Sequence, residues 1–371
     1  MFNFFKAFVV FTFLLFHSIS VECNNDSIIR PLSYSSRLHY GFIFTHTAVL
    51  HQFADRNPAG FEVDVMRLNN AQEDYVQCNC WSYTGVSIGF VNFGLPNILG
   101  NALTLNGFVE PVLLNHKLLM LDLRLGTGLA FLSKVYNAET NPTNQFFSSK
   151  LSFTLLGGLR LVVPINERFR IEGTSWYNHI SNGGIKQPNK GMNYPTFSLG
   201  LNYSPYREYF FDRNIMSLKS SKRNKKVFLR SFFSGKVQNE TPEYPLVFCP
   251  ISGFSGGYIH PFRTLSLISL SMGIERDGYL NESLRRNGRE IQKGIVDLAL
   301  GYGVSAGNFS FLLRMGLYIV APANQSDVIF QQYDLFYSIN SRLETGVYLK
   351  AHRHVAEHMG ISLFYNLYSQ N

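Results

Sequence analysis

The segment Leu119-Met120-Leu121-Asp122-Leu123-Arg124-Leu125-Gly126-Thr127-Gly128-Leu129 alternates with a period of two residues. Leucine occupies almost every odd position, and aspartate, arginine and glycine lie between the leucines. Successive side chains of a β-strand point to opposite faces, so this segment predicts a strand with one apolar and one charged face. An apolar stripe opposite buried charges is typical of a strand in an outer-membrane β-barrel.

The same alternation recurs in residues 151–163, 169–181, 309–319 and 361–367. Aromatic residues make up 15% of the chain and charged residues 16%, a composition that fits a lipid-facing surface with aromatic girdles. The sequence therefore predicts an all-β fold, an antiparallel outer-membrane β-barrel. The alternative is a soluble β-sandwich or lipocalin-like barrel, in which the apolar face would point inward.

Two short segments of the first half have counterparts in the second half. Leu121–Gly126 resembles Phe311–Gly316, and Arg170-Ile171-Glu172 resembles Arg342-Leu343-Glu344. We therefore expect two repeated halves of about eight strands each, the second a degenerate copy of the first. Both two eight-stranded barrels and one barrel of about sixteen strands are compatible with this repeat.

The expected domain order follows from these halves and from the charge pattern. Residues 21–210 are expected to form the first barrel half, residues 211–226 a basic linker, and residues 227–371 the second half. The run Lys219–Lys226 is interpreted as a solvated linker rather than a phosphate site. A polar linker between the halves favours two separable barrels over one large barrel.

Residues 1–20 are predicted to be a signal peptide. Lys6 precedes an apolar core at 7–16, and Ser18-Ile19-Ser20 is a small-x-small cleavage site. Lipidation at Cys23 is a weaker alternative, because a glutamate precedes this cysteine. No later apolar run approaches the ~20 residues of a spanning helix. The expected location is the outer membrane of a Gram-negative bacterium.

Net charge and cysteines narrow the expected partners. The formal net charge of +8 on an exported chain favours anionic lipid headgroups over nucleic acid as a partner. The four cysteines Cys23, Cys78, Cys80 and Cys249 would meet an oxidising compartment. Without a matching Cys/His pair, a disulfide to Cys249 or free thiols are expected rather than a metal site.

A histidine and a serine lie two residues apart at the end of the predicted strand 169–181. His179 and Ser181 therefore share a face, about 7 Å apart along the strand. Arg170 and Glu172 lie on the other face, which should line the lumen, so His179 and Ser181 should point toward lipid.

Loop lengths give this strand a direction. The predicted loops at 48–60, 92–107, 133–150 and 182–194 are long, and long loops of such barrels are extracellular. We expect residues 169–181 to form the seventh strand, which runs outward. His179 and Ser181 then lie at its outer end.

A serine and a histidine on one face are the side chains that acyl transfer requires. A serine hydroxyl is a weak nucleophile until a histidine accepts its proton, and the histidine needs a third group to fix its tautomer. Asn182, Gly183, Gly184 and Asn189 can offer backbone and side-chain N–H donors to a developing oxyanion. The His-x-Ser spacing alone is common by chance, so the motif needs independent support.

That support is a resemblance. His179-x-Ser181-Asn182-x-Gly184, followed by Pro188-Asn189-x-Gly191, resembles the active-site segment of the outer-membrane lipid A 3-O-deacylase family, also described as acyloxyacyl hydrolases. The resemblance covers about residues 40–203. It implies a membrane-embedded serine esterase that removes an ester-linked acyl chain, at the 3-position, from lipid A of lipopolysaccharide, in contact with outer-membrane lipids.

The resemblance also implies roles for single residues. His179 matches the base, Ser181 matches the nucleophile, and Asn182 and Asn189 match positions near the oxyanion site. Where the family has a glutamate this chain has Asn193, which can orient His179 but brings no charge, so slower chemistry is expected. Such chemistry requires no metal and no cofactor.

Two functions of other classes stay open. One is a non-catalytic barrel, porin-like or structural, with a vestigial site, and the other is an exported lipid-binding protein without turnover.

His352 and His354 are interpreted as interior residues of the second half. The sequence sets no oligomeric state.

Overall fold

The structure, a computed structural model, describes residues 32–71, 74–75, 80–208, 210, 225–262, 265–323, 327–353 and 355–369. The strands are β1 (Leu32–Gly41), β2 (Ala59–Asn69), β3 (Ser82–Asn92), β4 (Asn101–His116), β5 (Leu119–Leu132), β6 (Leu151–Pro164), β7 (Phe169–Ser181), β8 (Met192–Tyr203), β9 (Lys226–Gln238), β10 (Val247–Pro261), β11 (Ser266–Asp277), β12 (Ile295–Ala306), β13 (Phe309–Val320), β14 (Ile329–Ser338), β15 (Leu343–His352) and β16 (Val355–Ser369). A 3-10 helix, η1 (Ala48–Phe53), follows β1, and an α-helix, α3 (Gly278–Arg286), follows β11. None of the helices in these ranges is long and apolar enough to cross a membrane.

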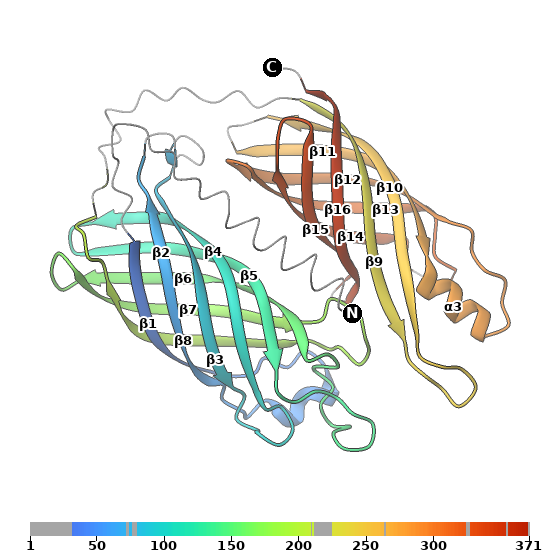
Figure 1. The fold of residues 1–371 in the computed structure, drawn as a ribbon, viewed down its shortest axis with the longest axis horizontal. Helices are drawn as coiled ribbons and strands as arrows, with labels where there is room; N and C mark the ends of the chain where they lie inside the picture. Colours follow the sequence, from blue (N-terminus) through green and yellow to red (C-terminus); the bar gives the residue numbers. More distant parts are fainter. Residues whose placement is uncertain are drawn as a thin grey trace. The chain divides into compact units, whose positions relative to one another are not determined.

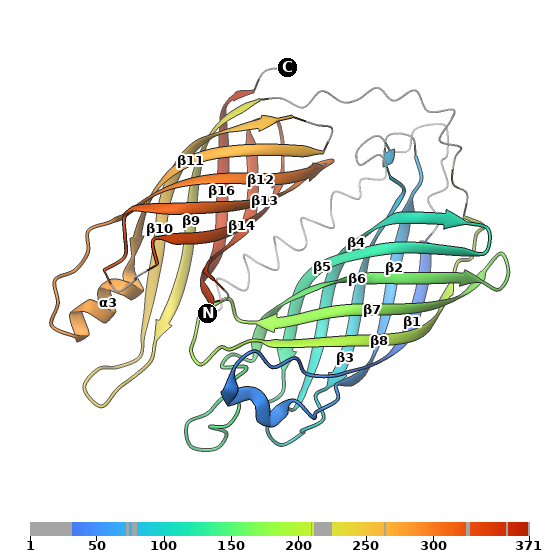
Figure 2. The ribbon, with the colours of Figure 1, turned by 180° about the vertical axis from the view of Figure 1, so that it is seen from behind.

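The strands form two closed antiparallel barrels, β1–β8 and β9–β16 (Figures 1 and 2). The first closes where β1 pairs with β8, from Tyr34 opposite Tyr203 to Gly41 opposite Thr196. The second closes in the same way between β9 and β16. The predicted fold class is thus confirmed, and of the two arrangements left open the pair of eight-stranded barrels is the correct one.

The repeat seen in the sequence corresponds to equivalent strands. Arg124 lies on β5 and Arg314 on β13, which are the fifth strands of their barrels. Glu172 and Glu344 lie on β7 and β15, the seventh strands. All four side chains are buried.

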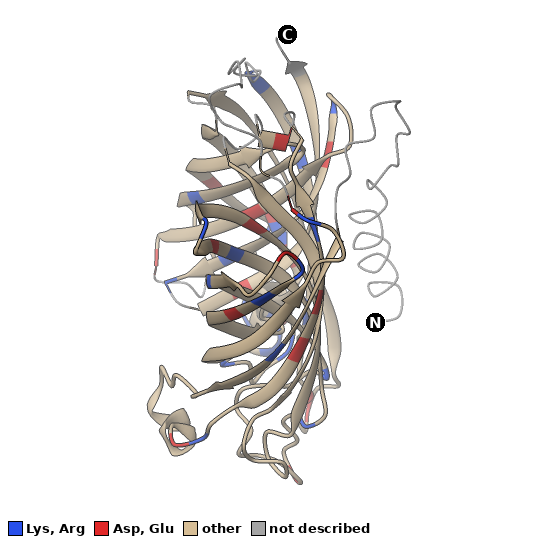
Figure 3. Cartoon of the chain, turned by 90° about the vertical axis from the view of Figure 1, so that its left-hand side faces the viewer, with Lys and Arg blue, Asp and Glu red and all other residues tan. Residues whose placement is uncertain are grey.

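Each barrel has an apolar outer surface, and its interior holds buried charged and polar side chains beside clusters of apolar ones. On β13 exposed and buried residues alternate strictly from Phe309 to Tyr318, with Phe309, Phe311, Leu313, Met315 and Leu317 outside and Ser310, Leu312 and Arg314 inside. In the first barrel Leu38 and Leu199 are more than 70% exposed, while Asp122 and Arg124 are fully buried. Charged positions are scattered among mostly uncharged strand residues (Figure 3). The soluble alternative is therefore wrong, because its apolar face would point inward.

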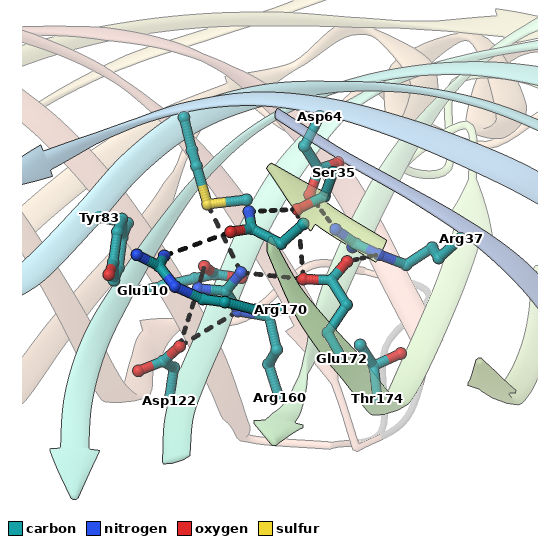
Figure 4. Close-up of polar contacts among 12 residues, drawn as sticks. Ser35, Arg37, Asp64, Tyr83, Glu110, Asp122, Arg160, Arg170, Glu172 and Thr174 are labelled. Atoms are coloured by element: carbon teal, nitrogen blue, oxygen red, sulfur yellow. Dashed lines mark hydrogen bonds and ion pairs between the residues drawn. The ribbon is translucent and has the colours of Figure 1, made fainter. Parts of the chain in front are cut away.

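An ion network fills the lumen of the first barrel. Three arginines, Arg37, Arg124 and Arg160, are fully or almost fully buried there. Figure 4 shows Arg37 and Arg160 directed at the same carboxylate, Glu172. The pairs are Arg37 with Glu62 (2.8 Å), Asp64 and Glu172 (3.0 Å), Arg124 with Glu62 (3.2 Å), Asp64 and Glu110, and Arg160 with Glu110 (3.2 Å), Asp122 (2.9 Å) and Glu172 (3.1 Å).

Replacing Arg124 by methionine should destabilise the first barrel strongly. Arg124 pairs with Glu62, Asp64 and Glu110, and its removal leaves these carboxylates buried without that partner. Breaking a buried ion pair from one side costs about 3–5 kcal/mol of the free energy of unfolding. Denaturant titration in detergent micelles measures it. Arg168→Met, at an exposed turn, is the control, and an equal effect of both variants would contradict a stabilising network.

The second barrel also has a charged interior. Arg230 and Arg314 lie near Asp334, and Lys350 pairs with Glu275 at 3.1 Å. His352 is buried, and its Nε2 atom lies 3.1 Å from the Tyr318 hydroxyl oxygen. His354, interpreted in the same way from the sequence, lies outside the described residues.

Several sequence predictions fall outside the described residues or need correction. The signal peptide at 1–20, Cys23, Cys78 and the linker residues 211–224 lie outside them. Cys80 is disulfide-bonded, but Cys249 is a buried free thiol, so the alternative of a disulfide to Cys249 is wrong. The predicted loop 92–107 is shorter than expected, because Asn101–Gly107 alternates and pairs with β3.

Candidate active site

The site lies where β7 ends and β8 begins. His179 and Asn193 are direct partners in the antiparallel register of these strands. Side chains of directly opposed residues share a face and lie close together. His179 Nδ1 accordingly lies 2.6 Å from Asn193 Oδ1, the distance of a short hydrogen bond.

The exposure pattern of β7 places this pair on the exterior of the barrel. Ser175 and Tyr177 are exposed, and His179 and Ser181 continue the same face as half-buried residues. Glu172 and Trp176 on the opposite face are buried in the lumen. His179 and Ser181 therefore lie on the surface that carries the exposed apolar side chains.

Ser181 is held by two hydrogen-bond donors. Its Oγ atom accepts from Asn189 Nδ2 at 2.9 Å and from the Gly183 amide at 3.1 Å. The described residues show no hydrogen bond between Ser181 and His179. Catalytic hydrogen bonds are often long before substrate binds, so an unbonded Ser181 and His179 are compatible with a nucleophile and its base in the resting enzyme.

Asn182 and Gly184 have a different position from the one the sequence suggested. The Asn182 side chain is buried and donates to Ser148 Oγ at 3.0 Å and to the Lys186 carbonyl at 2.8 Å. Its Oδ1 atom accepts from the Gly184 amide at 3.0 Å, so both residues hold the loop. The backbone N–H of Asn182 donates to Asn189 Oδ1 at 3.2 Å. This hydrogen bond leaves the side-chain nitrogen of Asn189 directed at Ser181.

Two contributors to the site, Gly191 and His46, are absent from the sequence-based set, whereas Gly183 is among the N–H donors expected from the sequence. Gly183 supplies an amide donor, and Gly183 and Gly191 both adopt a positive φ, of 66° and 68°. A Cβ at Gly191 would lie 2.8 Å from His179 Cε1, so glycine leaves room for the imidazole. His46 is the second of these two contributors, since its Nδ1 atom lies 3.3 Å from Asn193 Nδ2. The segment Pro188-Asn189-Lys190-Gly191 is typical of a turn, and a turn could have indicated the positive φ of Gly191.

Gly191→Ala should reduce any activity that depends on His179. The new methyl group meets the imidazole, and an L-residue at this positive φ is strained by about 1–2 kcal/mol. We expect a loss of turnover larger than the loss of folded protein, measured by initial rates at equal amounts of folded enzyme. Gly288→Ala, also at a positive φ but with nothing within 4 Å, is the matched control. Equal rates in Gly191→Ala and the parent would contradict this role.

Among the described residues, no group of three or more His, Cys, Asp or Glu side chains is arranged to hold a metal ion. The fold and the site together define an eight-stranded barrel of outer-membrane type that carries a Ser, His and Asn cluster on its exterior.

Comparison with known families agrees with this class. A family model described as "Lipid A 3-O-deacylase (PagL)" matches residues 60–202, and one described as "Acyloxyacyl hydrolase, C-terminal domain" matches residues 227–370. The first barrel thus matches the lipid A 3-O-deacylase family, and the second barrel matches the acyloxyacyl hydrolase C-terminal domain. The half interpreted as a degenerate repeat thus corresponds to a C-terminal domain described in its own right.

Solved structures were also found. The outer-membrane enzyme PagL matches with 14% identity over 46% of this chain and 98% of that one, at a TM-score of 0.31. A porin variant of Rh. blastica matches with 7% identity over 91% of this chain and 99% of its own, at 0.20. The siderophore receptor PirA of Acinetobacter baumannii matches with 7% identity over 88% of this chain and 43% of its own, at 0.21. No curated protein matches.

Proposed function

We propose that this protein is a membrane-embedded serine esterase that removes an ester-linked acyl chain, at the 3-position, from lipid A of lipopolysaccharide. The observation that carries the proposal is the cluster of Ser181, His179 and Asn193 on the apolar exterior of the first barrel. A substrate that reaches this face must already lie in the membrane. The match of residues 60–202 to the lipid A 3-O-deacylase family supports lipid A as that substrate.

The first half of the reaction forms an acyl-enzyme. His179 Nε2 takes the proton of the Ser181 hydroxyl while Oγ attacks the ester carbonyl carbon. Asn193 Oδ1 accepts from Nδ1–H of His179 and so keeps Nε2 free to act as the base. The tetrahedral intermediate then expels the sugar oxygen, which takes the proton back from His179 Nε2.

The second half releases the fatty acid. Water attacks the acyl carbon and gives its proton to His179 Nε2. Collapse of this second intermediate breaks the bond to Ser181 Oγ, which recovers the proton. The net reaction adds one water across the ester, and no step uses a metal or a cofactor.

Two N–H groups can stabilise the oxyanion. Gly183 N–H and Asn189 Nδ2–H both donate to Ser181 Oγ before reaction. As Oγ bonds to the carbonyl carbon it becomes a weaker hydrogen-bond acceptor, so these donors can turn to the neighbouring carbonyl oxygen while its negative charge develops. A preorganised donor of this kind contributes about 3 kcal/mol to transition-state stabilisation.

The proposal is tested by lipid A profiles from a Gram-negative host with and without the protein. Mass spectrometry should show a lipid A species that lacks one acyl chain when the protein is present. Tandem fragmentation assigns the position, and loss from another position would overturn the 3-position only. Equal profiles at a verified level of folded protein would overturn the esterase and leave the non-catalytic barrel or lipid-binding protein.

The packing of the lumen favours the esterase over a porin-like role for the first barrel. The buried arginine and carboxylate network occupies the lumen. A cavity there, lined by His39, Glu62, Asn106 and other residues, has a volume of only about 30 Å³. Export through a cleaved signal peptide and residence in the outer membrane of a Gram-negative bacterium form part of the same proposal.

A further inference from the structure

His46 lies behind the proposed Asn193 orienter, on the side away from His179. Asn193 uses both ends of its amide: Oδ1 faces His179 Nδ1 at 2.6 Å, and Nδ2 faces His46 Nδ1 at 3.3 Å. The three side chains therefore form a row, His179 to Asn193 to His46, on the exterior of the first barrel.

The backbone explains how a residue 147 positions away reaches this row. Beyond Gly41 the chain of β1 continues beside β8, and Phe44 forms a β-bridge with Asn193, with Phe44 N–H donating to the Asn193 carbonyl at 2.8 Å. In extended backbone, His46 is on the same face as Phe44, two residues farther on. A diagonal cross-strand neighbour of this kind is within reach of a long side chain.

An asparagine orienter has a weakness that a glutamate lacks. A carboxylate presents an acceptor from either oxygen, whereas an amide turned by 180° presents N–H groups instead. A flipped Asn193 would donate to His179 Nδ1 and leave the proton on Nε2. That tautomer cannot accept the Ser181 proton.

We propose that His46 is a positioning residue that fixes the amide orientation of Asn193 and through it the tautomer of His179. His46 Nδ1 accepts from Asn193 Nδ2–H, so the amide nitrogen faces His46 and the oxygen faces His179. This requires the His46 tautomer with its proton on Nε2. The inference rests on the proposed function for its kinetic consequence, but the tautomer of His179 can be observed without turnover.

The kinetic test uses purified protein and lipopolysaccharide in detergent micelles. His46→Ala should lower kcat about five- to tenfold, the factor expected for one hydrogen bond, with KM changed less than about twofold. His46→Asn keeps an acceptor close to the position of Nδ1 and should restore most of the rate. His51→Ala removes an exposed histidine from the nearby helix η1 and should leave the rate unchanged.

A double-mutant cycle separates positioning from a general structural role. In an Asn193→Glu background the carboxylate cannot present a donor, so His46→Ala should change kcat less than about twofold. The proposal would be overturned if His46→Ala lowered kcat equally in both backgrounds or did not lower kcat in the parent background. A change of KM alone would overturn it as well.

The tautomer test uses protein whose histidines are labelled with ¹⁵N. Ring nitrogen shifts should give the Nδ1–H tautomer for His179 in the parent and in His46→Asn, and a mixture in His46→Ala. An unchanged tautomer in His46→Ala overturns the role of His46. If the tautomer shifts but the parent hydrolyses no lipopolysaccharide, the positioning role stands and the proposed function fails.

Discussion

Ser181→Ala is expected to lower the rate of acyl-chain release by at least about three orders of magnitude, because the nucleophile of the proposed reaction is removed. The substitution deletes one half-buried oxygen atom, which accepts from Asn189 and Gly183. It creates no steric conflict, so the barrel should fold normally. Mass spectrometry of lipid A, at equal levels of folded protein in the outer membrane, measures the result.

Ser175→Ala is the matched control for this variant. Ser175 lies on the same strand and the same exterior face, but six residues before Ser181. Its replacement should leave the lipid A profile as in the parent. If Ser181→Ala deacylates as fast as Ser175→Ala, Ser181 is not the nucleophile.

Asn193→Ala should lower turnover by up to about four orders of magnitude, the scale seen when a Ser-His pair loses its orienter. The imidazole of His179 would lose its 2.6 Å partner and the constraint on its tautomer. Asn193→Glu should instead retain or raise the rate, because a carboxylate accepts from Nδ1–H and also stabilises the imidazolium. Initial rates of fatty-acid release from lipopolysaccharide in micelles compare the three proteins.

Both Asn193 variants must reach the membrane as folded barrels, which heat-dependent mobility on gels reports. A rate for Asn193→Ala equal to that of the parent would mean that the site works as a dyad or that another group orients His179. A rate for Asn193→Glu far below the parent would indicate that the amide nitrogen matters, as its contact with His46 suggests.

The strands and their faces were predictable because a period of two depends on near neighbours in the sequence. Phe169–Ser181 was expected as the seventh strand and is β7, with His179 and Ser181 on the exterior face. The family resemblance pairs His179 with Asn193, and the β7–β8 register gives this pairing a structural reason.

The rest of the site depends on contacts that no local pattern encodes. His46 comes from the chain after β1, and its place follows from the closure of the barrel between β1 and β8. The roles of Asn182 and Gly184 depend on the folded loop, in which an asparagine that can donate to an oxyanion instead donates to a neighbouring carbonyl. Alternation also could not decide between one barrel and two, because strand faces are the same in both.

The exterior position of His179 and Ser181 has a kinetic consequence for the proposed enzyme. Substrate would arrive by lateral diffusion in the plane of the leaflet, so encounter is a two-dimensional search. Its frequency depends on the mole fraction of lipid A among its neighbours, not on its concentration in bulk water. Adding inert detergent at constant total substrate should therefore slow the reaction by surface dilution, and the released fatty acid would leave sideways into the same layer.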